Sequence, residues 1–187
     1  MRDNARKTLR LALLCALIVS CGPTGALVPH DGLAHHRAVS DWAAQYGVPE
    51  PQYMASCQSS LPIPGPLYLD ALEGVVCLAT DSGGSWVYTY PRSQQSMAAE
   101  VMLAHEIGHH IIATMDGEQS ETAADCIAGA YYGEAHTRLQ AWWAGWMVPY
   151  RAASEAGAGL SPGARRRAWT RGVRGGIQEC LEETQTP

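Results

Sequence analysis

The stretch His105-Glu106-Ile107-Gly108-His109-His110 constrains this chain most, because it lies inside an apolar run from Met97 to Met115. Residues four apart on an α-helix lie one above the other, so a helical run places His105 and His109 on the same face. The remaining positions are apolar on nearly every side, which is typical of a central helix packed all round. We therefore expect a buried helix here, beginning near Ser93 or Ser96, either of which can cap it.

The spacing of these side chains also predicts chemistry. Two imidazoles four residues apart can hold one Zn²⁺, and Glu106, next to the first, can reach a water on that metal. His105 and His109 are thus candidate metal ligands, and Glu106 is a candidate general base. His110 points to another face, and we expect it to be a hydrogen-bonded core residue. Gly108 inside the helix suggests that a neighbouring backbone or a substrate approaches closely there.

A second segment completes the pattern after a break at Gly117. Glu121 opens a helical run to Tyr132 and lies four residues before Asp125, so both acids share one face. A catalytic zinc site needs a third protein ligand and an acceptor that orients a ligand imidazole. Glu121 fits the first need and Asp125 the second. The simpler alternative is that Glu121 occupies a first helical turn, where acids are favoured, and that Asp125 is solvated.

These two segments together resemble the neutral zinc metallopeptidase family of bacteria. The resemblance rests on the motif at 105–110 and on Glu121-x-x-Ala124-Asp125-Cys126-x-Ala128-Gly129. It continues through Pro162 to Trp169, Arg171-Gly172, Gly176 and Cys180, with looser likeness around Trp42 and at 67–70. The family belongs with the gluzincins, in which a Glu of an E-x-x-x-D helix is the third zinc ligand. The resemblance thus implies a zinc peptidase with Glu121 in that role.

The N-terminus predicts export. Four basic residues precede the apolar run Leu11 to Val19, which is too short to span a bilayer and is typical of a signal peptide. Ile18-Val19-Ser20-Cys21-Gly22 resembles a bacterial lipobox, so we expect residues 1–20 to be removed and Cys21 to be lipidated. Cleavage near Gly25-Ala26 is the alternative. Residues 21–33 would be a tether, and 34–187 a zinc metallopeptidase domain in the cell envelope, facing the periplasm or the exterior.

Charge excludes one class of partner. Without residues 1–20 the chain carries nine Arg, no Lys and seventeen acids, a formal charge of −8. Such a balance repels nucleic acid. The basic cluster from Arg165 to Arg174 is interpreted as a solvated helix face. The expected partners are a peptide or protein substrate and the membrane that holds the lipid anchor, and the sequence leaves the oligomeric state open.

Four cysteines remain after the leader and Cys21: Cys57, Cys77, Cys126 and Cys180. In an oxidising compartment they imply two disulfides, with three connectivities possible. We predict Cys126–Cys180, which would fasten the C-terminus behind the metal site. We also predict Cys57–Cys77, which would close the Pro-rich loop between them.

The rest of the chain predicts an α+β fold, a mostly helical, zincin-like single domain with a small β-sheet next to the zinc helix. Helices are expected at Ala38–Tyr46, from His136 to Met147 ahead of Pro149, and at Arg165–Val173. Short strands are expected at Leu67–Leu69, Val75–Ala79 and Trp86–Tyr90. Trp86–Tyr90 is either an edge to which an extended substrate adds or a plain half-buried strand.

The sequence leaves alternatives open for the placement of three tryptophans and for the identity of one catalytic donor. Trp142, Trp143 and Trp146 are expected in the core with one of them exposed, the alternative being a membrane-facing patch. A donor for the oxyanion of peptide hydrolysis is also required. The sequence offers four candidates without choosing among them: Tyr131, Tyr132, His136 and Arg138.

The function expected from these patterns is that of an exported, membrane-tethered zinc metallopeptidase. Glu106 would act as general base on a zinc-activated water. Two alternatives stay open. One is a non-catalytic zinc lipoprotein that binds a peptide or an envelope partner, and retention of Glu106 argues against it. The other is a hydrolase of cell-wall amides.

Overall fold

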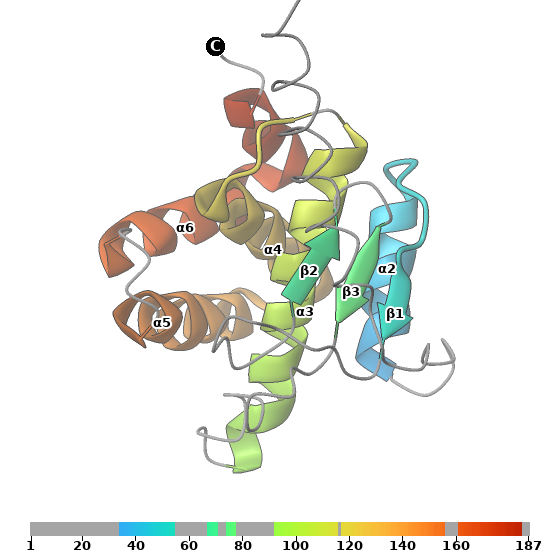
Figure 1. Cartoon of the computed structure of the whole chain (residues 1–187). Helices are drawn as coiled ribbons and strands as arrows, with labels where there is room; N and C mark the ends of the chain where they lie inside the picture. Colours follow the sequence, from blue (N-terminus) through green and yellow to red (C-terminus); the bar gives the residue numbers. More distant parts are fainter. Residues whose placement is uncertain are drawn as a thin grey trace, which may run out of the picture.

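The computed structural model describes residues 34–54, 67–70, 74–77, 92–115, 117–155 and 161–184 (Figure 1). The part described is mostly helical, with a small sheet, as the sequence predicted. Its elements, in chain order, are α2 (Ala34–Ala44), β1 (Gln52–Met54), β2 (Leu67–Asp70), β3 (Val75–Cys77), α3 (Arg92–Thr114), α4 (Glu121–Ala135), α5 (Arg138–Glu155) and α6 (Pro162–Thr184). No helix in these ranges is both long enough and apolar enough to cross a membrane.

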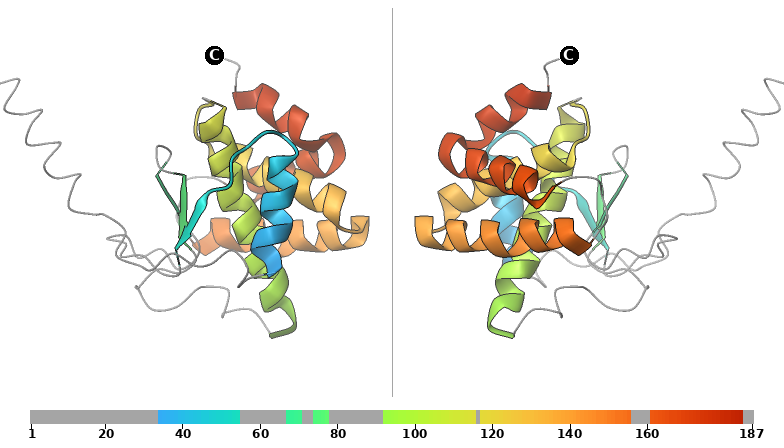
Figure 2. Two further views of the ribbon diagram at one scale, coloured as in Figure 1. Left: turned by 90° about the vertical axis from the view of Figure 1, so that its right-hand side faces the viewer. Right: turned by 90° about the vertical axis from the view of Figure 1, so that its left-hand side faces the viewer.

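Helix α3 lies at the centre of the fold, as expected for a helix that is apolar all round. Ile107, Ile111 and Ile112 are completely buried. Helices α2, α4 and α5 and strand β2 all contact α3, and the two side views in Figure 2 show it between the sheet and helices α4 and α6. From α2, Val39 and Trp42 enter this core, which confirms the expectation for Trp42.

The sheet has the order β1-β3-β2, with β1 parallel and β2 antiparallel to β3. It lies beside α3, where β2 contacts the helix. The sequence missed β1, because its three residues are too few to show a period. On the same side, the His110 imidazole is buried, with Nε2 2.8 Å from the carbonyl oxygen of Pro49. The expected strand Trp86–Tyr90 lies outside the described residues.

Several predicted helix boundaries are wrong. Helix α3 begins at Arg92, ahead of both serines proposed as its cap. The better signal is Pro91, the preceding residue in the sequence, because proline suits the first positions of a helix, where the N–H has no partner. Helix α5 continues through Pro149 to Glu155, although an interior proline removes one backbone hydrogen bond. Helix α6 extends to Thr184 across a break at Gly176, whose φ of 72° suits glycine.

The expectation that the tryptophans of α5 lie mainly in the core is wrong. Trp142, Trp143 and Trp146 are 53%, 50% and 38% exposed. Helix α5 instead buries its small residues, and a Cβ at Gly145 would lie 2.4 Å from the Trp169 ring of α6. Trp169 is itself buried, and its indole N–H donates to the carbonyl of Ala141. The large ring of α6 thus occupies the space that the tryptophans of α5 were expected to fill.

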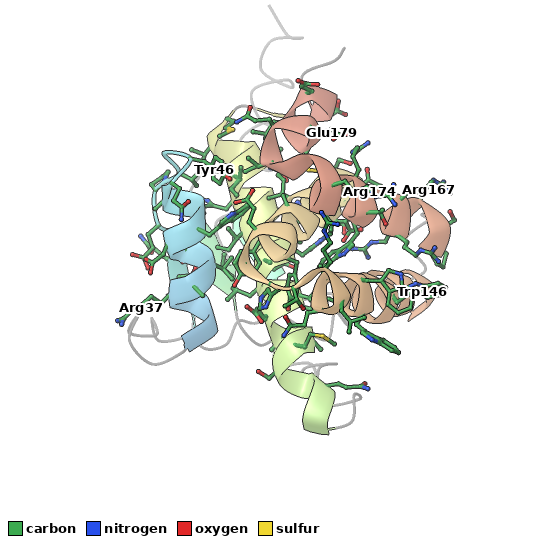
Figure 3. The ribbon with its side chains drawn as sticks, turned by 180° about the vertical axis from the view of Figure 1, so that it is seen from behind. Arg37, Tyr46, Trp146, Arg167, Arg174 and Glu179 are labelled. Carbon is green, nitrogen blue, oxygen red and sulfur yellow. A yellow bond between two sulfur atoms is a disulfide. The ribbon has the colours of Figure 1, made fainter. Side chains whose placement is uncertain are left out.

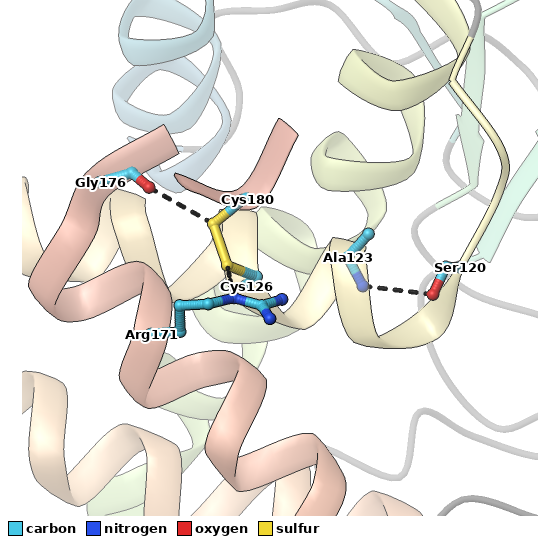
Figure 4. The surroundings of a disulfide bond; sticks show 6 residues. All are labelled: Ser120, Ala123, Cys126, Arg171, Gly176 and Cys180. Atoms are coloured by element: carbon cyan, nitrogen blue, oxygen red, sulfur yellow. Dashed lines mark hydrogen bonds between the residues drawn. A yellow bond between two sulfur atoms is a disulfide. The ribbon is translucent and has the colours of Figure 1, made fainter. Parts of the chain in front are cut away.

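Helices α4 and α6 approach so closely that glycine is required at the contact. A Cβ at Gly129 would lie 2.3 Å from the backbone oxygen of Trp169, and one at Gly172 would lie 1.8 Å from that of Cys126. The Cys126–Cys180 disulfide joins the same two helices, which confirms this predicted pair (Figure 4). Because α4 is held to α6 along its length, its N-terminal residues have a fixed position beside α3.

Candidate metal centre

Three predicted ligands converge at the contact between α3 and the start of α4. His105 Nε2 and His109 Nε2 lie 3.2 Å apart. The Glu121 carboxylate lies against both, with Oε2 3.2 Å from His105 Nε2 and Oε1 3.5 Å from His109 Nε2. These three side chains form the candidate metal site among the residues that the structure describes. Their donor atoms surround a single point, which is what one metal ion requires.

Local sequence explains how the two helices reach this geometry. Gly108 lies between the histidines, and a Cβ there would lie 2.9 Å from the backbone oxygen of Ala124. The close neighbour expected at Gly108 is therefore the backbone of α4. Ser120 caps α4 by accepting a hydrogen bond from the Ala123 amide, which fixes the first turn that carries Glu121. A small residue on one helix and a cap on the other thus bring the carboxylate to the imidazoles.

A second layer of polar side chains orients the imidazoles. His105 Nδ1 lies 2.9 Å from Asp125 Oδ1, the position that the sequence predicted for an orienting acid. An imidazole that donates through Nδ1 presents the Nε2 lone pair to a metal. His109 Nδ1 lies 2.8 Å from Gln119 Oε1, and the Gln119 amide nitrogen donates to the backbone carbonyl of His109. Each histidine thus has an acceptor on the side away from the shared point.

Arg165 holds Asp125 in place. Its guanidinium donates from Nε to Oδ2 and from Nη2 to Oδ1 of Asp125, the latter over 2.8 Å. The same Nη2 lies 3.5 Å from Glu121 Oε2. A two-pronged pair of this kind fixes both oxygens of a carboxylate. Arg165 is buried, so the interpretation of the whole cluster from Arg165 to Arg174 as a solvated face is wrong at this residue.

Electrostatics couple these groups. Burial alone would lower the pKa of His105, but hydrogen bonds to Asp125 and Glu121 and the nearby charges of Asp125 and Glu106 raise that pKa to about 10. Hydrogen bonds from His105 and then His109 hold the pKa of Glu121 well below its usual range. Without a metal, the site therefore favours an imidazolium that faces a carboxylate, and a metal cation must displace that proton to bind.

Glu106, the predicted general base, follows His105 on α3 and is buried. Its charge contributes to the raised pKa of both His105 and Arg165, so the carboxylate belongs to the same electrostatic cluster. It is not among the three convergent ligands. A buried carboxylate beside a candidate metal site and outside its ligand set is a candidate for proton transfer.

The residues considered as oxyanion donors lie elsewhere. The Tyr131 hydroxyl donates to Glu100 Oε1 over 2.7 Å, and that of Tyr132 donates to Oε2 over 3.2 Å. His136 Nε2 lies 3.0 Å from Glu100 Oε1. These three side chains thus surround a buried carboxylate toward the other end of α4, whereas Arg138 is exposed at the start of α5. The structure does not bring any of the four to the metal ligands.

Sequence reasoning missed Gln119 and the individual role of Arg165. Gln119 lies in the link between α3 and α4, two residues before Glu121, and this proximity was a usable signal. Arg165 is forty residues from Asp125, and only the packing of α6 on α4 brings them together. The predicted lipidation site Cys21 and Cys57 lie outside the described residues, so the Cys57–Cys77 pair stays a prediction.

Comparison with family models, with curated proteins and with solved structures finds no match to this chain.

Proposed function

We propose that this protein is a zinc-dependent metallopeptidase of the gluzincin type, with a zincin-like fold, related to the neutral zinc metallopeptidases of bacteria. The observation that carries the proposal is the convergence of His105, His109 and Glu121 beside a buried Glu106 that is not a ligand. A purely structural zinc site needs no such base. The additional carboxylate therefore favours catalysis over metal storage or simple binding.

The donor set suits zinc. Zinc bonds to nitrogen or oxygen at about 2.0–2.1 Å in tetrahedral sites, so two ligand atoms of one such site are about 3.3 Å apart. The separations among the three side chains are 3.2, 3.2 and 3.5 Å. Two imidazoles and one carboxylate leave the fourth position of a tetrahedral ion open, as a catalytic site requires. His105, His109 and Glu121 would hold the ion.

When bound, zinc supplies a water nucleophile at neutral pH and polarises the carbonyl of the scissile bond. Glu106 takes the proton of the attacking water on its carboxylate and delivers it to the leaving amine nitrogen. Asp125 and Gln119 keep the two imidazoles in the tautomer that presents each Nε2 to the metal. Arg165 holds Asp125 in place by donating to both of its carboxylate oxygens. The disulfide and the glycine contacts of α4 and α6 support this arrangement from behind.

We further propose that the protein acts in the cell envelope on a peptide or protein substrate, tethered through a lipid on Cys21. The leader at residues 1–20 and the lipobox-like segment support this placement. The disulfide is consistent with an oxidising compartment.

The test is replacement of Glu106 by Gln, which preserves shape but cannot accept a proton. Hydrolysis of an unfolded protein should fall by about 10²–10⁴-fold, the usual contribution of general acid–base catalysis. Zinc content and thermal stability should stay close to those of the wild type, because Glu106 is not a ligand. The matched control is Glu179→Gln, the same change at an exposed position of α6 (Figure 3), which should leave turnover unchanged.

Three outcomes would count against the proposal. Equal turnover by wild type and Glu106→Gln would exclude this mechanism. Turnover of purified cell-wall material and none of peptides would favour the wall amidase. Peptide binding without turnover by either protein would identify a binding module.

A further inference from the structure

We propose that the exposed face of α5 is a membrane-contact surface that docks this protein onto an anionic lipid bilayer. The surface, here called the tryptophan stripe, consists of Leu139, Trp142, Trp143 and Trp146. It goes beyond the proposed hydrolysis, because none of its residues belongs to the metal site. It is also distinct from the lipid predicted on Cys21, since it is made by the folded domain itself.

The stripe is a continuous apolar face. Its members are spaced at three, four and seven residues from Leu139, so they follow one side of the helix. Leu139 is 65% exposed, and the three indoles are exposed by about two fifths to one half. Trp142 contacts both neighbouring indoles, with ring centroids 5.2 Å from that of Trp143 and 5.9 Å from that of Trp146. The exposed rings thus form one cluster.

An apolar hollow extends this face toward α3. It has a volume of about 330 Å³ and is lined by Leu139 and Trp143 of the stripe, together with Gln94, Met97 and Gln140. A hollow of this kind at the edge of an exposed aromatic cluster can accept part of a hydrocarbon chain. The stripe and the hollow therefore offer a surface for tryptophan rings and a recess for a lipid tail.

Charge favours an anionic lipid surface over other occupants. Arg138 is exposed and lies one turn before Trp142, and at the other end the Arg166 guanidinium stacks over the Trp146 ring at 4.0 Å. The described side chains of α5, residues 138–146, include no carboxylate. This local positive rim contrasts with the net charge of −5 of the whole chain. Tryptophan flanked by arginine is the composition that interfacial membrane contacts use.

Area argues against a second copy of the chain as the occupant. Aromatic side chains bury about 150–250 Å² each when fully covered, so three partly exposed indoles and a leucine offer roughly 300–500 Å². A stable protein interface needs about 800 Å² from each partner. A patch of this size is instead sufficient for shallow insertion at a bilayer surface. One acyl chain alone gives only marginal membrane binding, and the stripe would supply the second contact that stable anchoring needs.

The experiment measures quenching of tryptophan fluorescence by vesicles whose lipids are brominated on the acyl chain. Every protein is the full chain with Cys21→Ser, so the predicted lipid cannot contribute and the leader is the same in all. We expect the indoles to be quenched strongly by phosphatidylglycerol vesicles and weakly by phosphatidylcholine vesicles. Trp42 and Trp169 are buried in the core and should contribute little.

Two variants and one control test the surface. Trp142→Gln with Trp143→Gln and Trp146→Gln should abolish most of the quenching. Arg166→Glu, which keeps all the indoles, should raise the lipid concentration for half-maximal quenching by at least about fivefold, since each basic residue contributes about 1 kcal/mol at an anionic surface. The control is Arg37→Glu, the same charge change on α2, on the opposite side of the molecule from Trp146 (Figure 3), and it should change nothing.

Three results would overturn the proposal. The first is wild-type emission that no vesicle quenches. The second is quenching that the triple variant retains, which would place the contact near an indole outside the stripe, such as Trp86. The third is a wild-type dimer in sedimentation that the triple variant disperses in the absence of lipid, which would make the stripe an interface between copies. Unchanged thermal unfolding of Arg166→Glu would show that its effect is not a folding defect.

Discussion

Helices α3 and α4 enclose two clusters of acid and imidazole, and the two clusters are built in opposite ways. At the start of α4, two imidazole nitrogens face each other across 3.2 Å, with the carboxylate of Glu121 beside them. Toward the end of α4, the carboxylate of Glu100 receives two tyrosine hydroxyls and lies 3.0 Å from the imidazole of His136. Both clusters use a Glu and at least one His between the same two helices.

The difference lies in whether donors and acceptors match. Glu100 is buried among donors, so that its cluster is satisfied as it stands. At the other cluster, His105 and His109 use their Nδ1 atoms on Asp125 and Gln119, which directs both Nε2 atoms and the half-exposed Glu121 to one point. That set has more lone pairs than protons, and a metal cation would satisfy it. The excess of acceptors is therefore what makes this cluster a candidate metal site, and the matched groups make the Glu100 cluster a structural one.

The largest expected difference between the clusters is in metal binding. Replacing His105, His109 or Glu121 with Ala should each remove zinc from the purified protein, because a site with two remaining ligands does not retain the ion. Glu100→Ala should leave one zinc per chain. Metal analysis after dialysis checks both expectations. Full zinc in Glu121→Ala would show that another group is the third ligand.

The Glu100 cluster, which should not affect metal binding, should instead contribute strongly to the free energy of unfolding. Glu100→Ala removes the acceptor of the Tyr131 hydroxyl and of His136, while the Tyr132 hydroxyl keeps its contact with the Met97 carbonyl. We expect a loss of about 3–5 kcal/mol in the free energy of unfolding. Glu100→Gln retains one acceptor oxygen and should lose about 1.5–3 kcal/mol. Urea unfolding in the presence of a chelator measures both. A Glu100→Ala protein as stable as the wild type would mean that this cluster does not hold α4 to α3.

The sequence predicted the convergence of the candidate metal ligands because the spacing of these residues determines their geometry. A separation of four residues on one helix places two side chains on the same face whatever surrounds them, so His105 with His109 and Glu121 with Asp125 could be paired directly. The cluster at Glu100 has no such signal, since its acid is on α3 and its donors are on α4 and just beyond it. The role of Arg165 was not predicted for the same reason, because its partner lies on another helix. Arg165 is one of several arginines on α6, and only packing shows that it is buried.

The tryptophans of α5 show a second limit of sequence patterns. An apolar stripe predicts a buried face, but it does not say which of two apolar faces is buried. Helix α5 has small residues on one face and tryptophans on another, and Trp169 of α6 occupies the space against the small residues. Which face of α5 is buried depends on the helix that packs against it, and that helix is determined by the tertiary fold.

The second layer should have a smaller effect than the ligands. Asp125→Asn removes the charge that orients His105, and zinc affinity should fall by about 10–100-fold, the usual effect of such a partner. Gln119→Ala is the matched change at His109. Its effect should be weaker, because Gln119 is a neutral, exposed partner. Competition with a chelating dye measures both affinities. Equal affinity in Asp125→Asn and wild type would exclude an orienting role for Asp125.

Counted per pH unit, the pH dependence of zinc binding is the smallest expected effect. The folded pKa of His105 is raised to about 10 in the metal-free protein, from an ordinary value near 6.5. The stability that this proton contributes is therefore fully present below about pH 6.5 and is lost as pH rises through about 10. Zinc must displace the proton, so its affinity should increase about tenfold per pH unit within that window.

Calorimetry from pH 6.5 to 8 in buffers of different ionisation enthalpy measures this linkage. Zinc binding should release about one proton from His105 at pH 7, and the increase in melting temperature on adding zinc should grow with pH. Glu100→Gln should show the same slope, because Glu100 is not one of the three convergent ligands. The opposite result would be almost no proton release, together with a zinc-induced increase in melting temperature that is constant from pH 6.5 to 8. It would mean that His105 is neutral before the metal binds. The candidate metal cluster would then hold a still larger excess of acceptors, and zinc binding would not depend on a proton from His105.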